Sequence, residues 1–264
     1  LEFRENQKML STYVDPLLKL AKEDEHSRIY TSFIQTGTAT GRLSSKDPNL
    51  QNIPVRSELG RSVRKAFVAK AGYKLVSIDY SQIELRLLAH FSGDKALNDA
   101  FNHGEDIHLA TAVKLFGEEE AKEKRHFAKA VNFGLLYGMG PKKLSEDTGV
   151  TMNEAKEVIK SYFATFPTVK SYLESVQERV KIDGYVETIL KRRRIFDYEN
   201  AGGMQKAAMM RESVNTVFQG SAADLIKLSM LQIDTMIREE HLDAEMLLQI
   251  QDELIFELKE EKMS

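Results

Sequence analysis

The sequence contains no cysteine, and its net charge is only −3 over 264 residues. The absence of cysteine excludes disulfides, thiolate zinc sites and cysteine nucleophiles. A net charge so close to zero excludes a general polycation, so any binding of nucleic acid must depend on local basic clusters. The chain also lacks an apolar run long enough to cross a bilayer and lacks a signal peptide at its start. We therefore expect an intracellular protein that is not secreted and has no membrane partner.

The composition that remains, 42% hydrophobic and 29% charged residues, is typical of a globular protein. The length predicts one large domain or two closely joined ones. The chain opens on Leu1 and stops in the charged run 259–264, and we interpret both ends as cuts in a longer polypeptide.

The stretch 74–86, KLVSIDYSQIELR, organises the rest of the chain. Leu75, Val76 and Ile78 predict a short buried strand that ends at Asp79. A helical period begins directly afterwards, so a helix is expected to start near Ser81 or Gln82. A carboxylate at such a junction stands on rigid scaffold and points outward, which suits a metal ligand.

A second pair of acids lies far downstream. The apolar run 246–251 leads into Asp252 and Glu253, and a further apolar run follows at 254–258, which predicts a β-hairpin with both acids at its tip. If the two strands are neighbours, Asp79 and Asp252 face each other, and such a pair can hold Mg²⁺. The alternative is that each acid belongs to a solvated turn.

The segment 118–136 is predicted to be a helix with a mixed face. Arg125, Lys129, Phe133 and Tyr137 recur every four residues and so share that face. Two cations followed by two rings suit a ligand with a polyanionic end and a flat end, as in a nucleoside triphosphate. The alternative is a solvated basic turn followed by core aromatics.

Two further segments carry polar candidates. The loop at 38–45, TATGRLSS, would let backbone approach a ligand closely, with Arg42 as its charged contact or, alternatively, as part of a solvated turn. Helices are predicted at 204–218 and again at 222–240. Asn215 and Gln219 are spaced by four, which puts two amide side chains on one face beside Arg211. Such side chains can contact base edges or the minor groove, or merely water.

Taken together, five motifs in register resemble the family A DNA polymerases, the bacterial polymerase I group. DYSQIELR at 79–86 resembles motif A, RHFAKAVNFGLLYG at 125–138 resembles motif B, and QDE at 251–253 resembles motif C. The sequences at 38–45 and at 217–225, VFQGSAADL, are also typical of that family.

The resemblance implies an α+β fold: a right-hand polymerase palm, with an antiparallel sheet plus helices, and a helical fingers insertion. It divides the chain into four parts. Residues 1–27 would form a thumb-base or connecting helix, 28–90 the first part of the palm, 91–203 the fingers, and 204–264 a second part of the palm that is truncated at its C-terminus.

The implied activity is template-directed DNA synthesis, with transfer of dNTPs to a primer 3′-hydroxyl and release of pyrophosphate. Two Mg²⁺ ions would serve as cofactors, with Mn²⁺ as a substitute, and primer-template DNA and dNTPs would be the partners of a monomer. The expected location is a bacterial or phage-infected cytoplasm, or an organelle. Two alternatives stay open: a DNA- or nucleotide-binding fragment without catalysis, and a two-metal nuclease that uses the same acids.

The resemblance also implies roles for individual residues around the metal ions and the primer. Asp79, Asp252 and the backbone carbonyl of Tyr80 would bind the ions, with Glu253 close by. The residues implied in contact with primer-template DNA are Arg42, Arg211, Asn215, Gln219 and Gln251.

For the incoming nucleotide, Arg125, Lys129 and His108 would contact the triphosphate, and Lys129 would also protonate the leaving group. Since His108 stands alone at a helix start, a partly buried structural histidine is its alternative role. The other implied nucleotide-binding residues are Phe133 beside the sugar, Tyr137 at the templating position, Glu84 as the group that excludes a ribose 2′-hydroxyl, and Gln82.

Two positions depart from the family pattern. Gln251 stands where a histidine is usual, and Gln cannot acquire the charge that a histidine gains near pH 6.5. His126 stands where a second arginine is usual. The first departure changes the expected contact with the primer terminus and its pH dependence.

Overall fold

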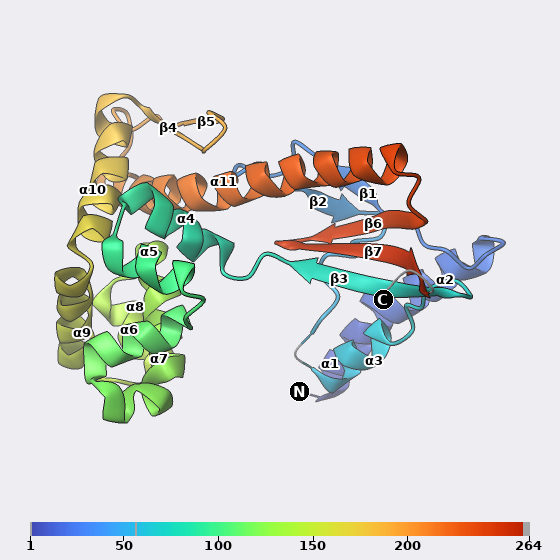
Figure 1. Cartoon of the computed structure of the whole chain (residues 1–264), viewed down its shortest axis with the longest axis horizontal. Helices are drawn as coiled ribbons and strands as arrows, with labels where there is room; N and C mark the ends of the chain where they lie inside the picture. The colour runs from blue at the N-terminus through green and yellow to red at the C-terminus, as the bar shows by residue number, and fades with distance from the viewer. Residues whose placement is uncertain (1, 56, 261–264) are drawn as a thin grey trace. The chain divides into compact units, whose positions relative to one another are not determined.

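The computed structural model describes residues 2–55 and 57–260, which form two compact units (Figure 1). Unit 1 contains the chain up to Ser81 and again from Leu225 onward, and unit 2 is the intervening segment Gln82–Asp224. The ends of the expected first and last parts, residue 1 and residues 261–264, lie outside the described residues.

Unit 1 begins with an interrupted helix. A π-helical turn, η1 (Leu10–Val14), separates α1 (Glu2–Met9) from α2 (Asp15–Glu23). The remaining elements of this unit are β1 (Ser32–Ile34), β2 (Ser44–Lys46), α3 (Glu58–Arg64), β3 (Tyr73–Asp79), β6 (Ala244–Ile250) and β7 (Glu253–Lys259), together with the C-terminal part of α11 (Gly203–Glu239).

An antiparallel sheet with the order β3-β7-β6 carries both predicted acidic segments (Figure 1). β6 and β7 form the predicted hairpin, with Gln251 and Asp252 in its turn. β3 pairs with β7 so that Asp79 lies opposite Glu253. The expected neighbourhood of the two acidic segments is therefore confirmed.

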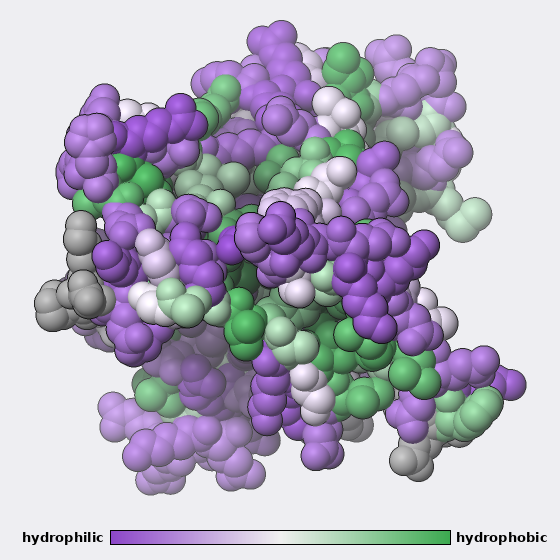
Figure 2. Space-filling model, turned by 90° about the vertical axis from the view of Figure 1, so that its right-hand side faces the viewer, coloured by the Kyte–Doolittle hydropathy of each residue, from purple (hydrophilic) through white to green (hydrophobic). Residues whose placement is uncertain are grey.

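The prediction that β3 is buried is wrong. Leu75 is 37% exposed and Ile78 is 56% exposed. β3 is the edge of its sheet and has only β7 as a neighbour among the described strands, so its apolar run is not enclosed. On the face drawn in Figure 2, apolar side chains lie exposed between hydrophilic ones.

Two apolar clusters hold unit 1 together. Leu17, Leu50 and Ile53 form one, against which Leu248 of β6 packs. The other places α11 on the hairpin, because Ile226 packs with residues of β7 and β6. The members of this second cluster are Ile226, Met230, Ile233, Ile237, Met246, Leu254, Phe256 and Leu258.

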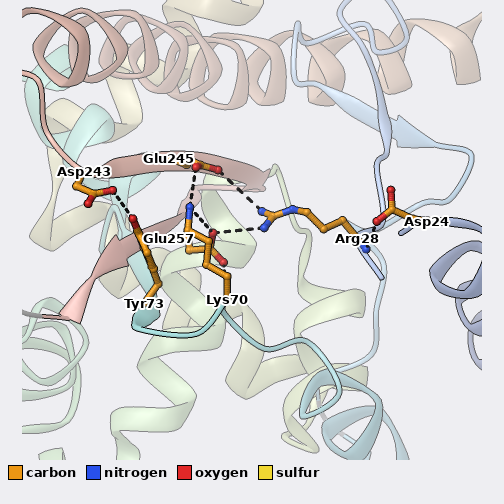
Figure 3. Close-up of polar contacts among 7 residues, drawn as sticks. All are labelled: Asp24, Arg28, Lys70, Tyr73, Asp243, Glu245 and Glu257. Atoms are coloured by element: carbon orange, nitrogen blue, oxygen red, sulfur yellow. Dashed lines mark hydrogen bonds and ion pairs between the residues drawn. The ribbon is translucent and has the colours of Figure 1, made fainter. Parts of the chain in front are cut away.

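A charged cluster anchors the same hairpin away from its acidic turn (Figure 3). The carboxylate of Glu257 is buried and accepts a hydrogen bond from the backbone N–H of Lys70 at 2.9 Å. The Lys70 ammonium also lies 2.9 Å from Glu245 and 3.5 Å from Glu257, and Arg28 lies 3.5 Å from Glu257. Burial alone would raise the pKa of Glu257, but the Lys70 N–H and the two cations hold that pKa below its usual value.

Unit 2 is mainly helical. Its elements are α4 (Ile83–Ser92), α5 (Lys95–Asn102), α6 (Ile107–Phe116), α7 (Glu118–Leu136), α8 (Pro141–Thr148), α9 (Met152–Thr165), α10 (Pro167–Ile182), the hairpin of β4 (Tyr185–Glu187) and β5 (Arg193–Ile195), and the N-terminal part of α11. α7 has the bounds predicted from sequence, and the predicted capping box of Thr151 and Glu154 opens α9. Ala112, Ala121 and Ala128 let α6 and α7 pack closely.

The two helices predicted at 204–218 and 222–240 form one helix, α11, of 37 residues. Gly220 between them does not end it, because a glycine in a helix interior costs only about 1 kcal/mol. The small residues Ser221 and Ala222 beside it are fully buried, so tertiary packing outweighs this cost. Helices and an antiparallel sheet built in this way confirm the predicted α+β class.

Candidate functional sites in the two units

The acidic turn of unit 1 is held by backbone pairing. The N–H of Tyr80 donates to the carbonyl oxygen of Asp252 at 3.0 Å, which extends the β3–β7 pairing beyond Asp79. Gln251 adopts a left-handed conformation, with φ +55°, that reverses the chain. Asp79, Tyr80, Asp252 and Glu253 are thereby brought together on adjoining strands.

The electrostatics of this turn disfavour further negative charge. Burial and the charge of Asp79 raise the pKa of Asp252, while Arg42, whose Nη2 lies 3.4 Å from Asp252 Oδ1, opposes the rise. Burial and the charge of Glu253 raise the pKa of Asp79. A bound cation would relieve this repulsion.

The donors present fit Mg²⁺. Mg²⁺ prefers oxygen ligands and is commonly held by one or two carboxylates, with substrate phosphates and water completing its shell. Asp79 and Asp252 provide such a pair. Across residues 2–55 and 57–260, no group of three or more acidic or histidine side chains is arranged to hold a metal by itself.

Several polar contacts that the sequence analysis missed surround the turn. Ser77, two residues before Asp79 on β3, donates a hydrogen bond to Glu253. The amide of Gln51 donates to the backbone oxygen of Gln249 at 3.0 Å and to its side-chain oxygen at 3.1 Å, and Gln249 in turn donates to the carbonyl oxygen of Gln251. Ser77 could have been found from sequence, because alternate residues of a strand share a face and Ser77 is two residues before Asp79. No pattern in the sequence links Gln51 to the hairpin.

In unit 2, the predicted mixed face on α7 begins with Arg125. Its Nε lies 2.6 Å from Oδ2 of Asp106, the residue that caps the N-terminus of α6. Burial alone would raise the pKa of Asp106. The hydrogen bonds that its carboxylate accepts from Arg125 and from the backbone N–H groups of His108 and Leu109, together with the charge of Arg125, hold that pKa below its usual value. Lys129, one turn further along, is exposed to solvent.

The second half of the face is half-buried and adjoins two buried polar groups. The ring of Phe133 lies 5.6 Å from that of His108, which is only 2% exposed. The hydroxyl of Tyr137 donates to Glu84, which is 4% exposed. These contacts join the face of α7 to α6, through Asp106 and His108, and to α4, through Glu84.

Gln82 precedes α4 in a left-handed conformation, with φ +57°. On α11, Arg211 is exposed, and its side chain approaches Gly138, where an added Cβ would lie 3.1 Å from Arg211 Cγ. The buried Oδ1 of Asn215 has no hydrogen-bond partner among the described residues, and Gln219 is half-buried. Asn215 is therefore an acceptor that a ligand could satisfy.

The predicted residues thus fall into two groups. Arg42, Asp79, Tyr80, Gln251, Asp252 and Glu253 belong to unit 1, whereas Gln82, Glu84, His108, Arg125, Lys129, Phe133, Tyr137, Arg211, Asn215 and Gln219 belong to unit 2.

Comparison with known proteins identifies the family. The profile of DNA polymerase family A matches residues 1–264. The chain belongs to DNA polymerase family A.

Within this family, the chain is 53% identical to the DNA polymerase I of Helicobacter pylori over 98% of its own length. It is 46% identical to the thermostable DNA polymerase I of Thermus filiformis over 99% of its length. It spans 29% of the first of these relatives and 32% of the second, about a third of either family A polymerase.

A solved structure agrees with the fold. The polymerase domain of Pol1 from M. smegmatis, determined in complex with a DNA primer-template and dNTP, superposes with a TM-score of 0.89 at 42% identity. The match covers 97% of this chain and 46% of that one. The palm and fingers architecture implied by the family resemblance is thereby confirmed.

Among the residues that the structure describes, no helix is long and apolar enough to cross a bilayer.

Proposed function

We propose that this chain is the palm and fingers portion of a template-directed DNA polymerase. The observation that carries the proposal is the pairing of β3 with β7, which brings Asp79 beside the turn that holds Asp252. Membership of family A and the mixed face of α7 support the same activity.

In this proposal, Asp79 and Asp252 bind two Mg²⁺ ions, with the carbonyl of Tyr80 as a further ligand, Glu253 close by and Mn²⁺ as an alternative ion. When bound, such ions lower the pKa of the primer 3′-hydroxyl and stabilise the departing pyrophosphate. Arg42, which already lies against Asp252, contacts the primer near its end. Gln251 offers an amide there, so this contact does not titrate between pH 5 and 8.

Unit 2 binds the incoming nucleotide in this proposal. Arg125 and Lys129 neutralise the triphosphate, and Lys129 protonates the pyrophosphate as it leaves. Phe133 and Tyr137 lie by the sugar and the templating base, and Gln82 contacts the nucleotide. The carboxylate of Glu84 excludes a ribose 2′-hydroxyl, while Arg211, Asn215 and Gln219 contact the primer-template.

We also propose that the chain works as a monomer on primer-template DNA in a bacterial cytoplasm, as its relatives are bacterial. The domain limits at 27, 90 and 203 belong to the same proposal.

Primer extension tests the proposal. The chain should extend a recessed primer with Mg²⁺ and four dNTPs, and Asp79→Ala should reduce the rate about a thousand-fold or more. Glu25→Ala, which removes an exposed carboxylate of the same unit, should leave the rate unchanged.

Three outcomes would contradict parts of the proposal. DNA binding without extension would make the chain a binding fragment, and shortening of the primer in the absence of nucleotides would make it a nuclease. Near-normal extension by Asp79→Ala would exclude that residue as a metal ligand.

A further inference from the structure

A buried polar cluster joins α6 and α7 beside the predicted nucleotide-binding face. His108 and Thr111 lie one turn apart on α6, and Asn132 lies on α7 directly before Phe133. These three side chains are only 2%, 0% and 1% exposed, respectively. Thr111 and Asn132 have no part in the mechanism proposed above, yet burial of an amide and a hydroxyl demands that their hydrogen bonds be satisfied.

The hydrogen atoms of this cluster can be assigned one by one. The hydroxyl of Thr111 has a single hydrogen. Its Oγ1 lies 2.7 Å from the carbonyl oxygen of Ile107 and 3.3 Å from Oδ1 of Asn132, so we assign the hydrogen to the shorter contact, with Ile107. Thr111 Oγ1 can then only accept from Asn132, whose Nδ2 lies 3.1 Å away. Oδ1 of Asn132 lies 3.3 Å from the same Oγ1, and the reverse orientation of the amide would bring the oxygen, in place of the N–H₂ group, to the shorter of the two contacts with Thr111, so we place Nδ2 there.

The second hydrogen of Asn132 Nδ2 determines the state of the histidine. Nδ2 lies 3.1 Å from Nδ1 of His108. Because Nδ2 is a donor, Nδ1 must present a lone pair, and the ring must carry its hydrogen on Nε2. Both the tautomer protonated on Nδ1 and the imidazolium cation would set N–H against N–H.

The surrounding charges favour the same neutral form. Burial lowers the pKa of His108, and the cations of Arg125 and Lys129 on α7 lower it further, while Asp106 opposes them. A third positive charge beside two cations would be repelled, whereas a neutral N–H adds a directional hydrogen bond without repulsion.

We propose that Asn132, supported by Thr111, is a positioning residue that fixes His108 as a neutral donor through Nε2–H toward a phosphate oxygen of a nucleoside triphosphate. The tautomer follows from the contacts within unit 2, and only the ligand rests on the proposed function. Because the donor does not titrate, the contribution of His108 to triphosphate binding is independent of pH between 6 and 8.

Nitrogen NMR of the chain with ¹⁵N-labelled histidine tests the tautomer without any need for activity. The His108 signals, assigned by their loss in His108→Gln, should show protonated Nε2 and bare Nδ1 from pH 8 to below 6.5, the ordinary titration point of histidine. Asn132→Asp replaces the donor by an acceptor, so it should move the hydrogen to Nδ1 and raise the pKa of the ring. Asn102→Asp, the same change at an exposed site on α5, should have no effect on His108.

The claim that Asn132 fixes the tautomer of His108 would be overturned by any of three results. These are a protonated Nδ1 in the unmodified chain, ordinary titration of His108 near pH 6.5, or an unchanged tautomer in Asn132→Asp. The ligand is tested by binding of inorganic triphosphate at pH 6 and pH 8. His108→Leu, which has no N–H to donate, is the baseline for protonation of the triphosphate itself. Relative to that baseline, the unmodified chain should bind about fivefold more tightly at both pH values, as expected for one hydrogen bond.

Asn132→Ala frees the ring to titrate, so its advantage over the baseline should grow as the pH falls from 8 to 6. An advantage in the unmodified chain that grows in the same way would overturn the proposal. No advantage at either pH, with the tautomer intact, would overturn the phosphate contact and leave polymerase activity to be decided by primer extension.

Discussion

The two units differ in the sign of the charge that each can still accept. In unit 1, the pKa values of Asp79 and Asp252 are raised by burial and by neighbouring carboxylates, so the acidic turn favours a cation. In unit 2, burial together with Arg125 and Lys129 lowers the pKa of His108, so the α6–α7 face favours an anion. A nucleoside triphosphate with Mg²⁺ supplies both charges, which is why we attribute one reaction to both units.

Replacing the carboxylate of Asp252 should have the largest effect. Asp252→Asn should reduce primer extension about a thousand-fold or more, because the proposed metal site loses one of its two carboxylates. The same change should stabilise the fold in the absence of divalent ions. The raised pKa means that the native state binds more protons than the unfolded state, so the stability of the unmodified chain falls as the pH rises from 3.8 through that pKa.

Thermal unfolding at several pH values checks this sign. The advantage of Asp252→Asn should be present at pH 7 and should disappear as the pH falls to about 3.8. Added Mg²⁺ should stabilise the unmodified chain and not the variant, since only a binding-competent native state gains from the ion. Glu25→Gln is the matched control, and a variant less stable than the parent at pH 7 would contradict the argument.

The cationic face of unit 2 should give the next largest effect. Lys129→Ala should lower kcat about a hundred-fold or more, as expected for loss of a general acid beside a polyanion. Lys124→Ala, on the opposite side of the same helix, removes an equal charge away from the mixed face and should leave kcat near normal. Equal losses in both variants would show that net charge, and not the mixed face, determines the rate.

The sequence predicted the two sites unequally. Asp79, Asp252 and the face of α7 follow from periodicity and strand ends, which are local patterns. Asn132 was missed because its partner His108 is 24 positions away, although an amide inside the apolar run 130–136 was a usable signal. The exposure of Ile78 and the continuity of α11 through Gly220 depend on which elements become neighbours, and no local pattern contains that information.

Tyr137→Phe should have a smaller effect, and the contact that it removes lies within unit 2. The buried carboxylate of Glu84 loses one hydrogen-bond donor while the ring is kept. A hydrogen bond to a charged buried group contributes about 1 to 3 kcal/mol, so the midpoint of thermal unfolding should fall by several degrees. Tyr30→Phe, at a side chain that is 69% exposed in unit 1, should not shift the midpoint.

The smallest predicted effect comes from two helix caps, one in each unit. Ser57 accepts from the N–H of Gly60 at the start of α3, and Thr151 forms the capping box of α9. Each change to alanine should cost about 1 kcal/mol. Because α11 runs from Gly203 to Glu239, across the boundary between Asp224 and Leu225, we expect the two units to share their global unfolding.

Native-state hydrogen exchange distinguishes shared from separate unfolding. If α11 couples the units, Ser57→Ala in unit 1 should lower the protection of the slowest amides in unit 2 by as much as in unit 1. Thr151→Ala in unit 2 should likewise lower the protection of the slowest amides in unit 1 by as much as in unit 2. Loss of protection confined to the substituted unit would show two independent folds joined by a helix. In that case, the preference of unit 1 for a cation and that of unit 2 for an anion could be altered separately. A substitution in one unit would then leave the stability of the other unit unchanged.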